Sequence, residues 1–316
     1  MITWANRWQI PLYLTGILAG AAVGILLPSA TPVFTALVNP TLIVLLFATF
    51  LAVPFVEIGR AARDVRFLAA ILLLNFALVP ALVFGLSRFV AHDRAILVGV
   101  LLVLLAPCID YVVVFTRIAG GAASRLLAVS PVVMLVQLAL LPVFIGLMAG
   151  PDVIDGIDIA PFTSAFGLFV VLPMGLAALT QALGRRVAVA RMVERSMDAA
   201  MVPILAVTLA VIVAAHVGTV RDHVSALLGV LPVYVAFLVA APLLGVVVSR
   251  LFRQDAATAR ATVFSGSTRN SLVVLPLALA LPQPLAAASA AVVAQTVVEL
   301  IGMIVLVRVV PRLIPR

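Results

Sequence analysis

Two polar interruptions, half a chain apart, hold the side chains of this sequence that could do chemistry. The first is Pro107-Cys108-Ile109-Asp110, and the second is the stretch from Ser265 to Ser271. The offset between Cys108 and Gly266 is half of the 316-residue chain. Non-helical polar backbone at membrane depth is tolerated only where it is buried in protein or lines a watery cavity. We therefore expect both interruptions to line one site near the centre of a bilayer, as the binding sites of transporters do.

The composition of the chain requires a membrane around these residues. Hydrophobic residues make up 65% and charged residues 10% of the sequence, and the mean hydropathy is +1.32. Soluble domains carry about 25% charged residues. The net charge of +8 comes from arginine alone, in short segments between apolar runs, a pattern that orients membrane spans and does not indicate nucleic acid binding. A single cysteine excludes an internal disulfide and a structural zinc cage.

Apolar stretches of about 20 residues predict an all-α membrane protein with ten spans. Residues 1–150 form a first five-helix repeat, 151–161 an external linker and 162–316 a second repeat. We expect the N-terminal apolar run to be the first span and not a cleaved signal peptide. The spans are expected near 10–27, 36–56, 67–87, 95–116 and 126–149 in the first repeat, and near 162–183, 199–217, 225–249, 260–281 and 285–307 in the second.

The arginines predict the orientation of these spans. Sixteen of them fall at the chain ends and in alternate connections, whereas only Arg88, Arg94 and Arg221 fall in the opposite connections. The positive-inside rule then places both termini of this multi-pass protein in the cytoplasm, with the plasma membrane as its location. Because each repeat has five spans, the second must be inverted relative to the first. Both polar interruptions fall in the fourth span of their repeat, so we expect broken helices 4 and 9 to cross at mid-membrane.

Asp110 and Arg269 are ionisable groups inside predicted spans. Insertion scales give a cost of about 2.5 to 3.5 kcal/mol for such a group at a helix centre. That cost implies partners, so we expect the two side chains to lie close together. Two roles stay open. One is a structural ion pair that fastens the broken helices, and the other is a functional pair in which Asp110 accepts hydrogen bonds or a proton and Arg269 sets the electrostatics of the cavity.

Glu299 lies inside the tenth predicted span, with Gln295 one helical turn before it on the same face. A carboxyl group at this depth favours its protonated form, which makes Glu299 a candidate proton carrier. The alternative is a protonated glutamic acid that only forms hydrogen bonds between helices. Weaker candidates are polar residues of a type that often only joins helices within a bundle: Asn75, Gln137, Asn270 and Ser271.

Cys108 is ambiguous when considered alone, because free cysteine often serves as a small buried apolar residue. Here it directly follows Pro107 in a helix break and precedes Asp110 by two residues. That position favours a cavity lining. Sulfur prefers soft, thiophilic species to hard cations, and one sulfur ligand binds weakly enough to release its cargo. No cofactor and no resident metal are expected.

Three motifs resemble the arsenite efflux permeases of the bile acid/arsenite/riboflavin transporter superfamily. They are Ala-Pro-Cys108, the segment from Phe264 to Ser271, and Val-Glu299 followed by Val307-Arg-Val-Val-Pro311. The resemblance implies a core domain with crossed helices 4 and 9, beside a panel of spans 1, 2, 6 and 7. It also implies that Cys108 contacts trivalent arsenic or antimony, that Glu299 serves coupling or substrate binding, and that protons drive export.

The chain departs from its relatives at the second interruption. Many arsenite permeases carry a glutamate in this segment, where this chain has Leu272 after Arg269 and Asn270. The sodium-coupled branch holds sodium with a glutamate and a glutamine, where this chain has Ser265 and Arg269. A fixed guanidinium at a cation position argues against sodium binding.

Two other classes of function are alternatives. An organic-anion symporter, coupled to sodium or protons, could hold a substrate carboxylate with Arg269. An intramembrane cysteine hydrolase needs a base beside its thiol, but His92, His216 and His223 fall near the external ends of spans, so we expect no enzyme. The sequence has no phosphate-binding loop for ATP. A separate ATPase partner is not expected, although the sequence leaves one open; the expected partners are lipid, protons and arsenite or antimonite.

Overall fold

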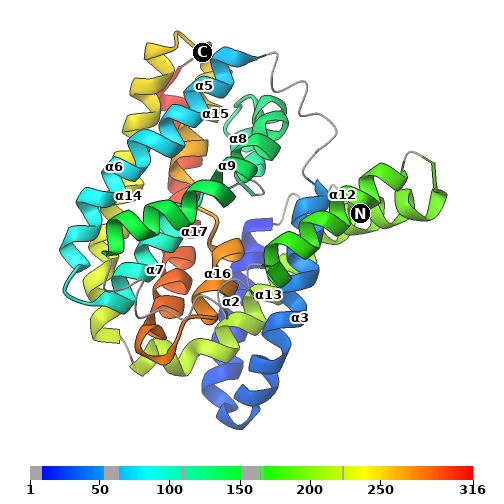
Figure 1. The fold of residues 1–316 in the computed structure, drawn as a ribbon, viewed down its shortest axis with the longest axis vertical. Coiled ribbons are helices and arrows are strands. Elements are labelled where there is room, and N and C mark those ends of the chain that lie inside the picture. Colours follow the sequence, from blue (N-terminus) through cyan, green and yellow to red (C-terminus); the bar gives the residue numbers. More distant parts are fainter. Residues whose placement is uncertain are drawn as a thin grey trace. The chain divides into compact units, whose positions relative to one another are not determined.

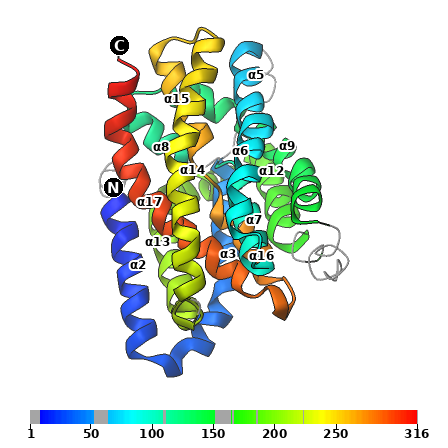
Figure 2. The ribbon, with the colours of Figure 1, turned by 90° about the vertical axis from the view of Figure 1, so that its left-hand side faces the viewer.

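Helices make up nearly all of the regular structure in the computed structural model (Figures 1 and 2). The structure describes residues 9–52, 64–108, 111–150, 164, 167–184, 186–222 and 224–315. Its internal contacts divide the chain into two units, and each unit combines segments from both halves of the sequence. Unit 1 comprises Met1–Ala52 and Ile159–Val224, and unit 2 comprises Val53–Asp158 and Ser225–Arg316.

Unit 1 is a group of packed helices. Helix α13 packs against α2 and α3, and α12 packs against α3 and α13. Gly16 and Gly20 of α2 lie directly against the backbone of Ala206 and Ala210 in α13, a pair of small-residue motifs that lets the two backbones approach closely. Its elements are α2 (Gln9–Leu26), η1 (Pro28–Ala30), α3 (Thr31–Ala52), η5 (Gly167–Val171), α12 (Leu172–Gly184) and α13 (Ala188–Asp222).

Unit 2 contains every candidate site residue of the sequence analysis. Helices α7, α16 and α17 lie side by side in it (Figure 1), and α9 packs against both α7 and α8. Its elements are α5 (Val65–Leu73), η3 (Leu74–Leu78), α6 (Val79–Ser87), η4 (Arg88–Val90), α7 (Arg94–Leu104), α8 (Tyr111–Ile118), α9 (Ala123–Ala149), α14 (Val224–Leu251), α15 (Ala256–Ser267), α16 (Ser271–Leu279), η6 (Gln283–Leu285) and α17 (Ala287–Leu313).

Short polar side chains fix where several helices of unit 2 begin. Each of these residues accepts a hydrogen bond from a backbone N–H of the first turn, which satisfies a donor that has no partner within the helix. Because each cap precedes an apolar run, the sequence itself sets the starting points. The capping residues are Asp64 for α5, Asp93 for α7, Asp255 for α15 and Asn270 for α16.

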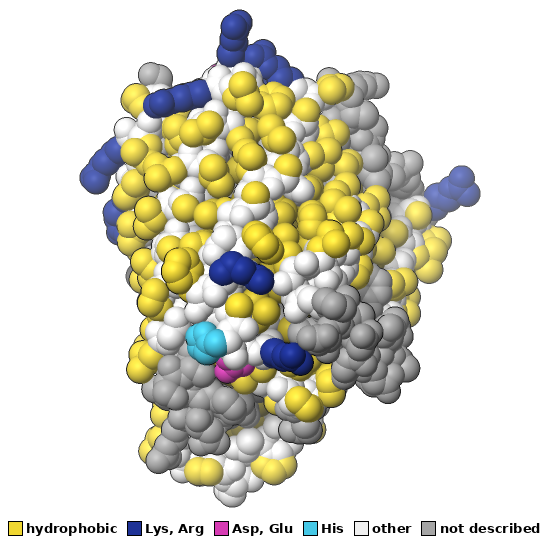
Figure 3. Space-filling model, turned by 60° about the vertical axis from the view of Figure 1, so that its left-hand side comes forward, with side chains coloured by type: hydrophobic (Ala, Val, Ile, Leu, Met, Phe, Trp, Pro, Cys, Tyr) yellow, Lys and Arg dark blue, Asp and Glu magenta, His cyan; other side chains and the backbone are white. Residues whose placement is uncertain are grey.

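Seven helical stretches of the described chain are long and apolar enough to cross a membrane. Apolar side chains are also spread over much of the described surface seen in Figure 3. The chain is therefore an α-helical, multi-pass membrane protein. Shorter apolar helices occupy 11–26 and 94–104. The ten predicted spans stay a prediction, because the regions of the first, fourth and ninth are not among these seven stretches. The first coincides with the shorter stretch 11–26, and the fourth and ninth coincide with pairs of short helices, α7 with α8 and α15 with α16.

Candidate functional site

The two predicted interruptions pair with each other in the structure. The break between α7 and α8 and the break between α15 and α16 run antiparallel, and Pro107 forms an isolated bridge with Arg269. Some of the backbone groups that the broken helices leave open are thereby satisfied by the opposite segment. Two hydrogen bonds flank the bridge: the Cys108 N–H donates to the Thr268 carbonyl at 3.1 Å, and the Asn270 N–H donates to the Ala106 carbonyl at 2.7 Å.

Different residues cause the two breaks. Pro107 has no N–H and so removes one bond of the helix ladder, and α7 ends before it, at Leu104. The second break contains no proline; instead, the hydroxyls of Ser267 and Thr268 donate to carbonyls one turn back, at 2.7 and 2.8 Å. Such local bonds compete with the helix ladder. Asn270 then accepts from the Val273 N–H at 3.2 Å and starts α16.

The Arg269 side chain is fully buried, at 0% exposure, and it donates mainly to backbone carbonyls. Its acceptors lie at the C-terminal ends of α7 and α15, where the last carbonyls of a helix have no partner and carry partial negative charge. The Phe237 ring lies 5.4 Å from the guanidinium carbon, in cation–π geometry. Nη1 donates to Leu104 O at 3.4 Å, and Nη2 donates to Ser265 O at 2.9 Å, Gly266 O at 2.6 Å and Asn75 Oδ1 at 3.0 Å.

Asn75 connects the third predicted span to this crossing. It lies in η3, a single π turn between α5 and α6, and such turns are frequent at functional sites. Its amide Nδ2 donates to Ser265 Oγ at 3.0 Å and to the Ile71 carbonyl at 3.1 Å, while its Oδ1 accepts from Arg269. The buried amide thus bonds to two different elements.

Glu299 of α17 binds the backbone of the second break. Its two carboxylate oxygens accept from the Arg269 N–H at 3.1 and 3.0 Å, and Gln295 Nε2 donates to Oε2. The side chain is 1% exposed. Gln295 and Glu299 share one face of α17, as their spacing predicts, and both lie at the crossing.

Three buried polar atoms near Glu299 have no hydrogen-bond partner within the part of the chain that the structure describes. They are Asn270 Nδ2, Ser271 Oγ and Gln295 Oε1. Buried polar atoms are rarely left unpaired, so each such atom requires an explanation. Hydrogen-bonding capacity of both kinds, donor and acceptor, is therefore left over beside the second break and on α17.

Cys108 is buried, at 3% exposure, and its backbone is held by the second break. Asp110, the expected partner of Arg269, lies outside the described residues. Gln137 of α9 is buried as well, and its Oε1 has no partner in the described part of the chain.

Two buried side chains that hold the crossing or its helices together were not predicted from the sequence. Phe237 faces Arg269 from α14, where nothing in its apolar surroundings distinguishes it. Arg260 was counted with the arginines of the cytoplasmic connections, but it is only 8% exposed. Its guanidinium donates to the carbonyls of Ala119, Gly120 and Ile314 and so ties α15 to the ends of α8 and α17.

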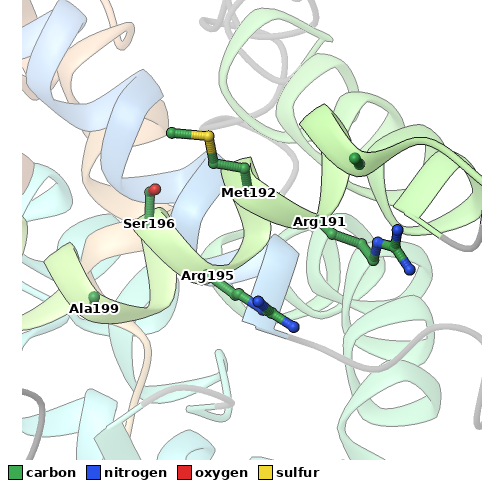
Figure 4. Close-up of a pocket in the computed structure, with 6 residues that line it drawn as sticks. Arg191, Met192, Arg195, Ser196 and Ala199 are labelled. Atoms are coloured by element: carbon green, nitrogen blue, oxygen red, sulfur yellow. The ribbon is translucent and has the colours of Figure 1, made fainter.

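An open hollow of about 590 Å³ lies along the N-terminal part of α13 in unit 1 (Figure 4). Arg191 and Arg195 extend from one side of the helix, and Met192 and Ser196 from the other. All lining residues come from this single helix, and none is a candidate site residue. The hollow is therefore not part of the candidate site.

The comparison with known families identifies the group to which the chain belongs. The model of the sodium bile acid symporter family matches residues 39–227, more than half of the chain. The matched range includes Asn75 and Cys108 and ends before Arg269 and Glu299. Among curated proteins, none matches the chain. The chain thus belongs to the sodium bile acid symporter family, a family of membrane transporters and not of enzymes.

Proposed function

We propose that this protein exports trivalent arsenic, and antimony of the same valence, across the plasma membrane in exchange for protons. The observation that carries the proposal is the pairing of the Cys108 segment with the second break, to which Glu299 also binds. A thiophilic ligand and an acid are thereby brought to one crossing. The protein would act as a secondary transporter that confers arsenic resistance.

The chemistry of the crossing suits arsenous acid, As(OH)3, which is neutral at physiological pH. The Cys108 thiol would form an As–S bond while one As–O bond breaks, and the thiol proton would leave with that hydroxyl as water. The two remaining hydroxyls can donate and accept hydrogen bonds. They could therefore pair with the atoms of Asn270, Ser271 and Gln295 that have no partner among the described residues. Hydrolysis of the single As–S bond restores the thiol and releases the cargo.

Glu299 would couple proton movement to the second break. As a carboxylate it accepts the Arg269 N–H with both oxygens, a charge-assisted arrangement. Protonation removes that charge and weakens the contact between α17 and the break. Asp110 is a second proposed proton carrier.

The proposed mechanism requires the topology expected from the sequence. Two inverted five-helix repeats, 1–150 and 162–316 with 151–161 as the external linker, would place broken helices 4 and 9 across each other at mid-membrane. The arginine distribution supports cytoplasmic termini. Alternating access would then expose the crossing to each side in turn.

Transport by inverted membrane vesicles tests the proposal. Vesicles with the wild-type protein should accumulate arsenite when their lumen is acidified, and Cys108→Ser should reduce the rate at least tenfold with normal protein in the membrane. Met303→Leu is the matched control, because Met303 Sδ lies 3.5 Å from Thr268 Oγ1 at the same crossing but is not a thiol. Normal arsenite export by Cys108→Ser would refute the proposed sulfur ligand.

The family match favours a second candidate, a sodium- or proton-coupled symporter of an organic anion. Such a protein would need a cation to hold the substrate carboxylate. Arg269 is a poor choice, because its guanidinium already donates to four oxygens of the chain. Uptake of a bile-acid-like anion under a sodium gradient, unchanged in Cys108→Ser, would establish this second function.

A further inference from the structure

Four oxygen atoms from three separate segments converge on the guanidinium of Arg269. Two are the carbonyls of Ser265 and Gly266 near the end of α15, one is the Leu104 carbonyl at the end of α7, and one is Asn75 Oδ1 in η3. The donor–acceptor distances run from 2.6 to 3.4 Å. The positive charge of Arg269 therefore joins two half-helices and the π turn.

Such an oxygen cluster is of the kind that binds a hard cation. In secondary transporters, unwound backbone carbonyls and the C-terminal ends of half-helices coordinate sodium, because the helix dipole gives these ends partial negative charge. Backbone and amide carbonyls are also the ligands that hard cations prefer.

The residues present do not fit sodium in this chain. The oxygens around Arg269 already accept from Nη1 and Nη2, so a metal ion would compete for the same lone pairs. A second positive charge at this distance would also be repelled. An arginine keeps its charge at every physiological pH, so deprotonation cannot remove the positive charge from this position.

We propose that the Arg269 guanidinium is a tethered cation that replaces a coupling sodium ion, and that this protein works without sodium. This inference rests on the proposed function only in treating the chain as a transporter, and it holds for any substrate. It also predicts the effect of removing the tether: Arg269→Ala would leave four unpaired oxygens around a space that sodium can enter.

Thermal unfolding of the purified, detergent-solubilised protein tests the inference. Unfolding is followed in sodium chloride and in choline chloride at equal ionic strength. The wild-type midpoint should be the same in both salts. The midpoint of Arg269→Ala should be lower in choline and should rise by several degrees with sodium, saturating as a binding site fills.

Arg269→Met is the matched control, because methionine removes the charge but fills much of the space. Its midpoint should fall without a sodium response. The inference is overturned if sodium stabilises the wild-type protein, if Arg269→Ala is indifferent to sodium, or if Arg269→Met responds equally. The wild-type measurement shows whether sodium stabilises the protein even where Arg269→Ala does not fold. No substrate is present, so this result is independent of whether arsenite is exported.

Discussion

Asn75 bonds on three sides, to Ile71, Ser265 and Arg269, and is completely buried. Asn75→Leu keeps the branched shape of the side chain but leaves Arg269 and Ser265 each without one partner. Loss of a buried hydrogen-bond partner costs about 1 to 3 kcal/mol, so we expect the unfolding midpoint to fall by several degrees. Ser130→Ala is the matched control, because the buried Ser130 hydroxyl only bonds back to Leu126 in its own helix. Equal midpoints for the two variants would contradict the bridging role of Asn75.

Asp255 provides a pH-dependent contribution to stability outside the spans. The Thr258 hydroxyl, 2.6 Å from Asp255 Oδ2, and the Thr258 N–H lower the pKa of the carboxyl below its ordinary value. A lowered pKa stabilises the fold above about pH 4, the ordinary value, and this contribution is lost as the pH falls through the folded-state pKa.

Thr258→Val should therefore lower the free energy of unfolding at pH 7, and with it the unfolding midpoint. The loss should be less than about 1 kcal/mol, because the carboxylate is largely exposed. The difference from wild type should shrink below about pH 4. Thr262→Val serves as control, since the Thr262 hydroxyl bonds to the neutral Gln254 amide and should give a difference that does not depend on pH. A pH-independent difference for Thr258→Val would count against this assignment.

At the scale of elements, α7 and α17 approach so closely that a glycine is required between them. A Cβ at Gly99 would lie 2.6 Å from the Ala288 carbonyl oxygen. Gly99→Ala should push apart the helices that carry the first break and Glu299, at a cost of about 1 to 3 kcal/mol. Gly229→Ala in α14 is the control, because its Cβ meets nothing within 4 Å and alanine favours the helix. A Gly99→Ala midpoint at or above that of Gly229→Ala would contradict the close packing.

The positions of the two breaks could be predicted from the sequence, but most of their bonding could not. Pro107 and the run of hydroxyl residues before Asn270 interrupt their helices locally, so the signal lies within a few residues. The acceptors of Arg269 are mostly backbone carbonyls, which every residue has. Likewise, Arg260 is indistinguishable by sequence from a solvated arginine, although it binds three distant carbonyls.

At the scale of the whole molecule, the arginine distribution makes a prediction about topology. Fluorescent-protein and alkaline-phosphatase fusions at the two termini should both report the cytoplasm, and a phosphatase inserted in the 151–161 linker should be active outside. This outcome requires an odd number of spans on each side of the linker, as an inverted pair of five-span repeats has. Termini on opposite sides of the membrane would rule the pair out.

The helical content and the membrane character of the chain follow from composition and apolar run length alone. The division into two units does not, because each unit joins two segments that the other unit separates in sequence, from 52 to 159 in unit 1 and from 158 to 225 in unit 2. Only long-range packing, such as that of Gly16 and Gly20 against α13, decides which helices belong together.

The most direct measurement of the central claim uses the fact that Cys108 is the only cysteine of the chain. A membrane-permeant maleimide can therefore label one thiol, and the rate of labelling reports whether that thiol is occupied. Arsenite should slow the labelling of the wild-type protein several-fold in a saturable manner, whereas a bile-acid-like anion should leave the rate unchanged. An identical labelling rate with and without saturating arsenite would contradict the assignment of Cys108 as its ligand.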